Sequence, residues 1–451
     1  MKNFIRLFIF CSFLFSFPAF CASPEPLPIL ELLQQLIRID TSNPPGNEIV
    51  LAKWIQGYLQ RFGIPSEIIE SSPGRANLIA RLTGDGSAEP LALLGHLDVV
   101  PADPQEWDHP PFAAEIEGDS LYGRGSLDMK GLVALEVNAF IRLKEEKLPL
   151  KRDVILVLTS DEEAGGKQGA QFLTEQHWDK VKAKYVFNEG SIGIRHGNRN
   201  LYSIQVAEKG VSWMKLTAHG SSGHGSMPRP DNAVVSLVNA MHRLANSPQP
   251  LVKTEVVQEF LNRTSKDAPF LTGWMMRHLF DWPLVKFAPL LIRDELKRQK
   301  AFNAMVRNTV TPTMLNAGYK INVIPAEATG FVDARILPGE TPAAFQKKLE
   351  KVLGDLPVKL EPILQSEPNA SDFRTPYFET IEKAILENDP EAIVTPYMSP
   401  GATDSRFFRE KGVVCYGLIP FVISENDIDS SHGKNERVKV TELTRRRKKS
   451  V

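Results

Sequence analysis

The sequence has few cysteines, and after its first segment it has none that could pair. Three cysteines occur in 451 residues, and two of them, Cys11 and Cys21, lie in a leader that we expect to be removed. A mature chain with Cys415 alone cannot form an internal disulfide. Cys415 lies inside the apolar stretch 413–418, and no residue near it in sequence would lower its pKa. We therefore interpret it as a small core residue rather than a nucleophile.

The sequence also lacks an excess of charge of either sign. It has 53 Lys and Arg against 54 Asp and Glu, so no broad field favours nucleic acid or an anionic membrane as a partner. A small-molecule partner fits this balance better. The length allows two hydrophobic cores, or one large core with a substantial insert, and we expect two domains.

A long apolar run occurs only at the N-terminus, at residues 7–17, after two cationic residues. It is too short to cross a bilayer comfortably, and the small residues Ala19 and Cys21 suit a cleavage site. We predict a signal peptide over residues 1–21, a secreted or periplasmic mature chain and no stable membrane span in it. The alternative is a lipoprotein anchored through Cys21, which the bulky Phe20 fits poorly.

Short strand-like runs alternate with helix-like segments through the first half of the chain. The strand-like runs are 77–82, 91–95, 153–159 and 184–187, and the helical segments are 48–62, 130–146 and 170–176. This alternation predicts an α/β fold with a mainly parallel sheet and helices on both faces. The carboxyl edge of such a sheet is where a reactive site is expected.

The pattern changes after about residue 205 and indicates an inserted α+β domain. We expect strands at 212–218, near Tyr319 and at 328–336, and a helix at 232–244. We predict a signal peptide at 1–21, a first catalytic part at 22–206, the insert at 207–366, a second catalytic part at 367–444 and a basic tail at 445–451. In the second catalytic part the sheet pattern resumes near 378–386 and 413–418. The insert includes an apolar segment, 247–307, which we expect either to pack as helices on the insert or to line a greasy substrate site.

Several motifs place acids and histidines at strand ends. His96 ends the run 91–95, and Asp98 shares its face two residues later, where it could hold the far ring nitrogen. Asp128 lies in a Gly-rich loop before a helix, where a helix N-cap is the alternative role. Each motif alone is weak evidence, and a structural hydrogen bond is the better explanation of the first when it is taken by itself.

Further acids follow the next two strands. Glu162 and Glu163 are neighbours, so one could bind metal while the other faces substrate as a proton shuttle, although a solvated turn is the alternative. Glu189 follows a fourth strand, and His432 lies in a late polar loop. Taken together, two histidines and several carboxylates at one sheet edge predict a zinc site, with cobalt or manganese as substitutes.

In this order the five motifs resemble those of the M20 metallopeptidase family of aminoacylases, carboxypeptidases and deacylases, over nearly the whole mature chain. The similarity is greatest to the carboxypeptidase S and N-acyl-amino-acid hydrolase branch. The resemblance implies two Zn²⁺ ions, one on His96 and Glu189 and the other on Glu163 and His432, with Asp128 bridging both.

The same resemblance implies that Glu162 is the general base, that Asp98 orients His96, and that a cis peptide follows Asp128. It also implies that the insert is a ferredoxin-like lid or dimerisation domain, through which a homodimer could form. Its loop around His224 matches the family loop whose histidine steadies the oxyanion, from the other subunit or after domain closure. By chemistry alone His224 is more simply a surface residue.

The resemblance extends to the substrate-binding residues. Asn322 and Arg335 match, and Arg335 is a natural bidentate clamp for a carboxylate, with a salt bridge to Asp333 as the alternative. The loop 399–404, with Gly401 and Thr403, resembles the family's Gly-rich substrate loop. Two positions depart from the family, because Ala402 and Ser191 stand where glycine is common, and the methyl group of Ala402 would narrow the substrate pocket.

We therefore expect hydrolysis of an amide bond in a peptide or N-acyl amino acid with a free carboxylate. Two alternatives are a binding or regulatory protein that kept this fold but lost catalysis, and a secreted binding protein whose two lobes close on a ligand. The retention of Glu162 and of every ligand argues against the first, and the second would need no metal.

Overall fold

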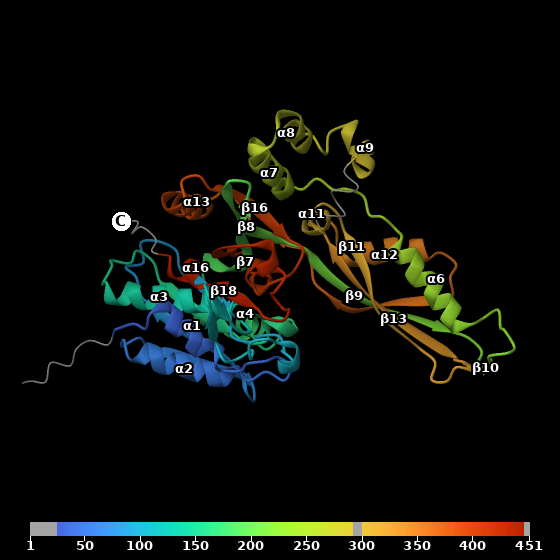
Figure 1. The fold of residues 1–451 in the computed structure, drawn as a ribbon, viewed down its shortest axis with the longest axis horizontal. Helices are drawn as coiled ribbons and strands as arrows, with labels where there is room; N and C mark the ends of the chain where they lie inside the picture. The colour runs from blue at the N-terminus through green and yellow to red at the C-terminus, as the bar shows by residue number, and fades with distance from the viewer. Residues whose placement is uncertain (1–24, 292–299, 446–451) are drawn as a thin grey trace, which may run out of the picture.

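The computed structural model describes residues 25–291 and 300–445. Figure 1 shows a larger α/β part and a smaller part that extends away from it, connected by the chain where it runs from β8 into β9. The predicted signal peptide, the Cys21 anchor and residues 446–451 of the predicted basic tail lie outside the described residues. Within the described ranges, no helix combines the length and apolar character needed to cross a membrane.

The larger part is built on a nine-stranded sheet. Its order is β1 (Ser66–Ser72), β2 (Arg75–Leu82), β6 (Val154–Thr159), β3 (Leu91–His96), β7 (Tyr185–His196), β17 (Val414–Ile423), β8 (Arg199–Glu208) and β15 (Asn369–Ala370), with β16 (Ile393–Ser399) beside β8. The central strands β6, β3, β7 and β17 are parallel, whereas β1 and β2 add antiparallel pairs at one edge. The prediction of a mainly parallel sheet is confirmed.

Helices cover both faces of this sheet. On β6, Leu156 and Leu158 face a core formed with α1 (Ile29–Ile37), α2 (Glu48–Gln60) and α3 (Lys130–Glu145). The alternate residues Ile155 and Val157 face a second core formed with α4 (Ala170–Gln176), α5 (Trp178–Val181) and α14 (Ser405–Glu410). Because both faces are buried, β6 is apolar throughout, as the sequence of a central parallel strand usually is.

The smaller part is the inserted domain. Its antiparallel sheet has the order β11 (Thr309–Ala317), β13 (Glu327–Ile336), β9 (Gly210–His219) and β14 (Val358–Gln365). Helices α6 (Ala233–Ala245) and α12 (Pro342–Leu353) cover one face and complete a separate core. The chain order β9–α6–β11–β13–α12–β14 is that of a ferredoxin-like domain, as expected.

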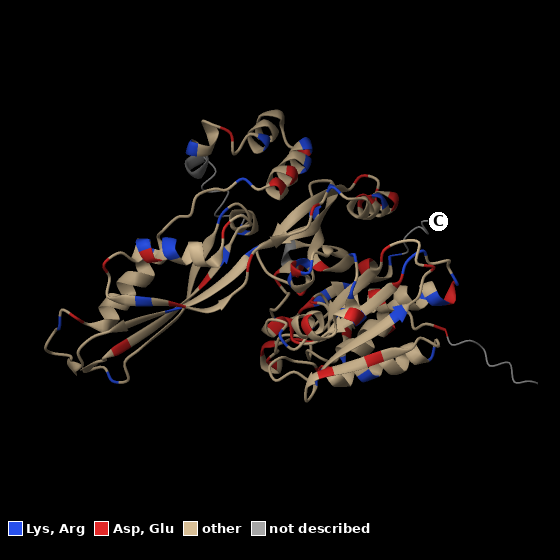
Figure 2. Ribbon diagram, turned by 180° about the vertical axis from the view of Figure 1, so that it is seen from behind, with Lys and Arg blue, Asp and Glu red and all other residues tan. Residues whose placement is uncertain are grey.

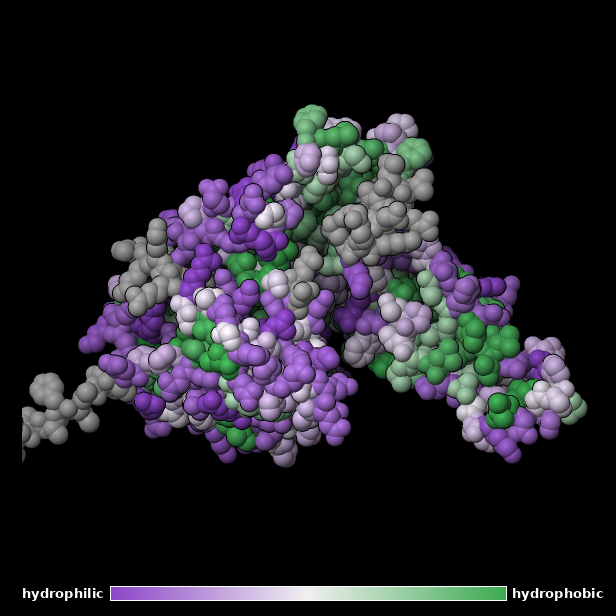
Figure 3. Space-filling view, in the orientation of Figure 1, coloured by the Kyte–Doolittle hydropathy of each residue, from purple (hydrophilic) through white to green (hydrophobic). Residues whose placement is uncertain are grey.

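The apolar segment forms four described helices, α7 (Glu255–Thr264), α8 (Phe270–Arg277), α9 (Leu284–Leu291) and α11 (Lys300–Met305). Of these, α7, α8 and α11 contribute side chains to a core of the larger part. Val257 and Leu261 of α7 join a core with Val394 of β16, so the expectation of helices packed on the insert is wrong for α7. Phe270 at the start of α8 and Trp282 between α8 and α9 are 86% and 75% exposed. Hydrophobic atoms also gather at the top of the molecule in Figure 3, where Figure 1 places these helices.

One predicted strand is absent, and the strand expected near Tyr319 ends before that residue, as β11 at Ala317. Residues 378–386 belong to helix α13 (Pro376–Asn388), which begins at a Thr375 cap with proline in the first turn and buries Phe378. Tyr319 lies in an exposed connection between β11 and β12. The remaining short elements are β4 (Glu115–Glu117), β5 (Ser120–Tyr122), β10 (Gly223–His224), β12 (Val323–Ile324), α15 (Glu425–Ile428), β18 (Arg437–Lys439) and α16 (Val440–Thr444).

Candidate metal centre

Asp128 lies between two histidines that come from distant parts of the chain. Its Oδ1 is 3.1 Å from Nε2 of His96, at the carboxyl end of β3, and its Oδ2 is 3.0 Å from Nε2 of His432. The Asp128–Met129 peptide bond is cis, as the resemblance implied. One carboxylate therefore presents a separate oxygen to each imidazole, which is the arrangement that a bridging ligand requires.

Two further acids flank this arrangement. Glu163 Oε2 is 3.2 Å from Nε2 of His432, and Glu189 Oε1 is 3.8 Å from Nε2 of His96. Ligand atoms of His96, Asp128 and Glu163, and separately of His96, Glu162 and Glu189, lie within 4.8 Å of one another. The structure therefore brings all five predicted ligands and Glu162 together, and Figure 2 shows acidic residues gathered on the side of the larger part that faces the insert.

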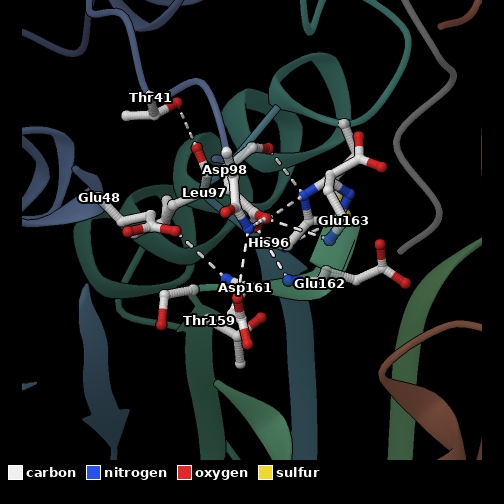
Figure 4. Close-up of polar contacts among 12 residues, drawn as sticks. Thr41, Glu48, His96, Leu97, Asp98, Thr159, Asp161, Glu162 and Glu163 are labelled. Carbon is white, nitrogen blue, oxygen red and sulfur yellow. Dashed lines mark hydrogen bonds and ion pairs between the residues drawn. The ribbon is translucent and has the colours of Figure 1, made fainter. Parts of the chain in front are cut away.

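Asp98 contacts both His96 and the backbone of Glu162 and Glu163 (Figure 4). Its carboxylate accepts hydrogen bonds from Asn43 Nδ2 at 2.8 Å and from the backbone N–H groups of Glu162 and Glu163, both at 3.1 Å. His96 Nδ1 is 2.9 Å from the Asp98 carbonyl and 3.5 Å from its carboxylate. The carbonyl thus favours a proton on Nδ1, which leaves Nε2 available as a ligand.

A buried network under this turn was not predicted. Asp161 adopts a left-handed backbone with φ of 70°, which is uncommon for a non-glycine residue. Arg75 Nη2 bonds Asp161 at 2.9 Å and Glu48 at 2.7 Å, so three charged side chains fix the turn that begins the short 3₁₀ helix Glu162–Ala164. Arg75 and Glu48 belong to β2 and α2, and nothing in their local sequence indicated this contact.

Glu436 supports the Asp128 loop and was also missed. Its fully buried carboxylate accepts hydrogen bonds from the N–H groups of Gly125, Leu127 and Asp128, at 3.0, 2.7 and 3.1 Å. Arg124 Nη1 donates to the same carboxylate at 2.6 Å. Glu436 follows His432 by four residues in the same polar motif, which was the available signal that it belongs near the site.

The local electrostatics favour a cation. Burial and the neighbouring Glu189 raise the pKa of Glu162 well above its usual value, and burial and Asp128 do the same to the pKa of Glu189. Burial also acts to raise the pKa of Asp128, but hydrogen bonds with His432 and His96 outweigh it and lower that pKa. Asp128 and Glu163 raise the pKa of His432 to about 10. Without a cation, protons on His432 and on the buried glutamates therefore offset the repulsion between the carboxylates.

The residues fit divalent metal ions. Glu163 Oε1 is buried without a hydrogen-bond partner among the described residues, a costly state that a cation would relieve. Imidazole nitrogens with carboxylate oxygens are ligands that zinc, cobalt and manganese accept. His96, Glu189, Asp128, Glu163 and His432 are the residues that would hold them.

Three predicted residues lie away from this centre. His224 belongs to β10, which Figure 1 places at the end of the insert farthest from the large sheet. Asn322 precedes β12, the partner strand of β10, and its carbonyl accepts from the Gly225 N–H. His224 Nδ1 is 2.7 Å from Ser226 Oγ. Arg335 makes the alternative salt bridge, with its Nε 2.7 Å from Asp333 Oδ1. Within this single chain, none of the three completes the site.

The predicted substrate loop begins where β16 ends. The Gly401 N–H bonds Ser399 Oγ at 3.1 Å, and the Thr403 hydroxyl donates to Glu208 at 2.6 Å. Next to it, the buried Asp404 accepts from Thr159 Oγ1 at 2.7 Å. Polar contacts with β6 and β8, which the sequence did not indicate, therefore fix the loop on the large sheet.

Comparison with known proteins agrees with this geometry. Residues 92–448 match the family described as Peptidase family M20/M25/M40. The chain is 32% identical to "N-fatty-acyl-amino acid synthase/hydrolase PM20D1.1" of Danio rerio, over 81% of this chain and 72% of the relative. It is 29% identical to "Probable carboxypeptidase S-like 2" of Dictyostelium discoideum, over 79% of this chain and 69% of the relative.

Among solved structures, the fold resembles that of the M20 family metallo-carboxypeptidase Sso-CP2 from Sulfolobus solfataricus. The TM-score is 0.71 at 20% identity, covering 92% of this chain and 96% of that one. The family match extends from β3 to the end of the described chain and includes every predicted ligand. The chain therefore belongs to the M20 peptidase family and is an enzyme of its metal-dependent peptidase and amidohydrolase type.

Proposed function

We propose that this enzyme uses two divalent metal ions, most simply zinc, to hydrolyse an amide bond beside a free carboxylate. The observation that carries the proposal is Asp128, whose two oxygens each face a different histidine while Glu163 and Glu189 flank the pair. One metal on each side of Asp128 would satisfy all five ligands, and Glu162 would remain for proton transfer.

Cations held by these five residues would supply an acidified water and would polarise the amide carbonyl. The Glu162 carboxylate accepts the proton of the attacking water and then delivers it to the departing amine. Glu162 is suited to both steps by its position, because its carboxylate lies beside His96 and Glu189 and makes no hydrogen bond among the described residues. Asp98 keeps Glu162 in place through the backbone N–H bond described above.

The insert would supply the remaining groups. We propose that His224 stabilises the oxyanion and that Asn322 and Arg335 bind the substrate, together with Gly401 and Thr403 of the loop. Because His224 lies at the far end of its own insert, a second subunit or a large closure must bring it to the metals. A homodimer is favoured by the exposed edge strand β11 beside α6, where Met314, Leu315 and Val238 are about half exposed.

We propose a peptide or an N-acyl amino acid as substrate, with a preference for long acyl chains or hydrophobic residues. The support is the similarity to an N-fatty-acyl-amino acid synthase/hydrolase, together with the exposed aromatic side chains of the apolar segment 247–307. Equal kcat/KM on acetyl and long-acyl amino acids would remove the preference but leave amide hydrolysis intact. We also propose that the chain is exported through its N-terminal segment.

The test is to purify the mature chain, measure bound metal and assay dipeptides and N-acyl amino acids with and without chelator. We expect chelation to abolish turnover and added zinc to restore it. Stoichiometric ligand binding with no turnover under any metal would instead favour a non-catalytic binding protein, the alternative function.

A further inference from the structure

Glu208 lies at the neck where the chain leaves the larger part for the insert. It is the last residue of β8, Lys209 follows, and β9 begins at Gly210. The returning chain passes close beside this point, because a Cβ on Gly210 would lie 2.6 Å from the Ser366 carbonyl oxygen. The neck is therefore two tightly packed segments, and Glu208 is buried in it with 1% exposure.

The Glu208 carboxylate accepts hydrogen bonds both from the substrate loop and from the sheet and helix beneath it. From the substrate loop, the Thr403 N–H and hydroxyl donate to it at 3.1 and 2.6 Å. From the larger part, Gln205 Nε2 donates at 2.8 Å and Arg409 Nη1 at 2.7 Å. A buried carboxylate with this many charge-assisted and backbone donors is held rigidly.

The next residue reaches the other end of the same loop and the helical segment. The Lys209 N–H donates to the Ser399 carbonyl at 3.1 Å, so residues 208 and 209 hold both ends of the loop. The buried Lys209 ammonium donates to the carbonyls of Ala304 and Arg307, at 2.9 and 2.8 Å, just before β11 of the insert begins. The neck is thus connected to the loop, to the helices and to the insert.

We infer that Glu208 is a positioning residue that fixes the substrate loop 399–404 relative to the neck of the insert. Its carboxylate acts through Thr403 and touches neither metal ligand nor substrate. A change in the angle of the insert at the neck would reach the loop through Glu208. The loop adjoins the metal centre through Asp404, which bonds Thr159 at the end of β6 and acts electrostatically on Glu162 and Glu189. This inference rests on the proposed function only in taking the loop as a substrate contact.

Glu208→Gln tests the inference, because it keeps the size of the side chain and removes its charge. We expect KM to rise about tenfold or more, with a smaller fall in kcat and unchanged bound metal, as the loop loses a charged acceptor. Ser371→Ala is the matched control, since Ser371 Oγ accepts from the same Arg409 at 3.3 Å but does not contact the loop. The control should lower Tm and leave KM within twofold.

A double variant shows whether Glu208 acts through Thr403. Glu208→Gln added to Thr403→Val should raise KM no further than Thr403→Val alone, whereas a merely structural role would multiply the two effects. If Glu208→Gln does not fold, Thr403→Ser should recover most of the KM defect of Thr403→Val, because serine keeps the hydroxyl donor. Equal KM for the serine and valine variants would refute the inference.

Amide hydrogen exchange over residues 399–406 tests the positioning without any substrate. We expect exchange about tenfold faster in Glu208→Gln, because glutamine offers one neutral oxygen where the carboxylate offered two charged ones to the Thr403 N–H and hydroxyl. Exchange should be unchanged in Ser371→Ala, which leaves both acceptors in place. Unchanged exchange and KM in folded Glu208→Gln would overturn the inference. A wild-type chain that hydrolyses no amide would overturn the proposed function alone, and the exchange result would still decide the role of Glu208.

Discussion

At the scale of single residues, the adjacent acids Glu162 and Glu163 have different surroundings. Glu163 contacts His432 directly, whereas Glu162 groups with His96 and Glu189 and makes no hydrogen bond through its carboxylate among the described residues. Glu162→Gln should therefore lower kcat about 10²- to 10⁴-fold with bound metal unchanged. Metal analysis and kinetics check this, with Glu145→Gln on the exposed face of α3 as the control. Wild-type kcat in Glu162→Gln would remove its role as base.

Protons and metal ions compete for the same atoms in this site. Because Asp128 and Glu163 raise the pKa of His432 to about 10, the metal-free folded chain holds that proton at neutral pH. Zinc binding must displace it, so zinc affinity should fall as pH is lowered from 8 to 6, and protons should be released on binding.

Titration of the metal-free chain with zinc in weakly buffered solution, with a pH-sensitive dye, measures this release. His432→Gln should release fewer protons than the wild-type chain. An affinity that does not change with pH would show that the histidines are already neutral without metal.

The sequence predicted part of the site directly, because His96, Glu162, Glu163 and Glu189 lie at strands whose carboxyl ends are set by apolar and β-branched runs. Asp128 and His432 lie in loops, so their place beside these residues was implied by the family resemblance, and the structure brings them together. The sequence did not predict Glu436 or Arg75, whose roles depend on contacts between segments far apart in the chain. Nor could it place His224, because a position on the insert says nothing about how the insert sits relative to the metals.

At the scale of elements, β7 and β17 approach each other unusually closely beside Glu189. A Cβ on Gly417 would lie 1.9 Å from the Glu189 carbonyl oxygen, at a point where the strand register shifts. Gly417→Ala must therefore push β7 away, at a cost of about 1–3 kcal/mol, and displace Glu189. We expect lower zinc content and at least tenfold lower kcat/KM.

The matched control is Gly57→Ala, in the middle of α2. A Cβ there meets nothing within 4 Å, so alanine should stabilise the helix by about 0.5–1 kcal/mol and leave activity unchanged. Thermal unfolding and metal analysis of both variants separate a local effect at Glu189 from a general effect of adding a methyl group. Full zinc content in Gly417→Ala would contradict the expectation.

The Asp128 loop depends on Glu436 in a similar way. Glu436→Ala would leave Arg124 buried without its carboxylate and three backbone N–H groups without their acceptor, so we expect a loss of about 3–5 kcal/mol in unfolding free energy. Denaturant unfolding measures this loss. Glu442→Ala removes one hydrogen bond from the Val422 N–H and a partly exposed ion pair with Arg445, so it should cost far less. Equal costs would count against the loop-supporting role.

Elements with a clear period were predictable and ambiguous ones were not. The strands before His96 and Glu162 are apolar runs too short for helices, and the structure confirms them. Residues 378–386 were mistaken for a strand, although Phe378, Ile381 and Ile385 follow a helical spacing after the Thr375 cap. A short apolar run can therefore be assigned to a helix or a strand only when the capping residues before it are also considered.

At the scale of the whole molecule, the distance between His224 and the metals makes a dimer testable. If His224 serves the neighbouring subunit, Glu162→Gln and His224→Ala subunits, each inactive alone, should recover about a quarter of wild-type activity when mixed and re-associated. Sedimentation establishes the oligomer and kinetics the recovery. A monomer, or a dimer with no recovery, would instead place His224 in its own subunit after closure.

The burial of Cys415 has a practical consequence for measuring such motions. It is fully buried, and burial raises the pKa of its thiol to about 12, so it will not react with maleimide reagents near neutral pH. A chain that starts after Cys21 therefore has no background labelling. One fluorophore on the insert and one on the larger part would follow the angle between them during turnover, in the native sequence apart from two surface substitutions.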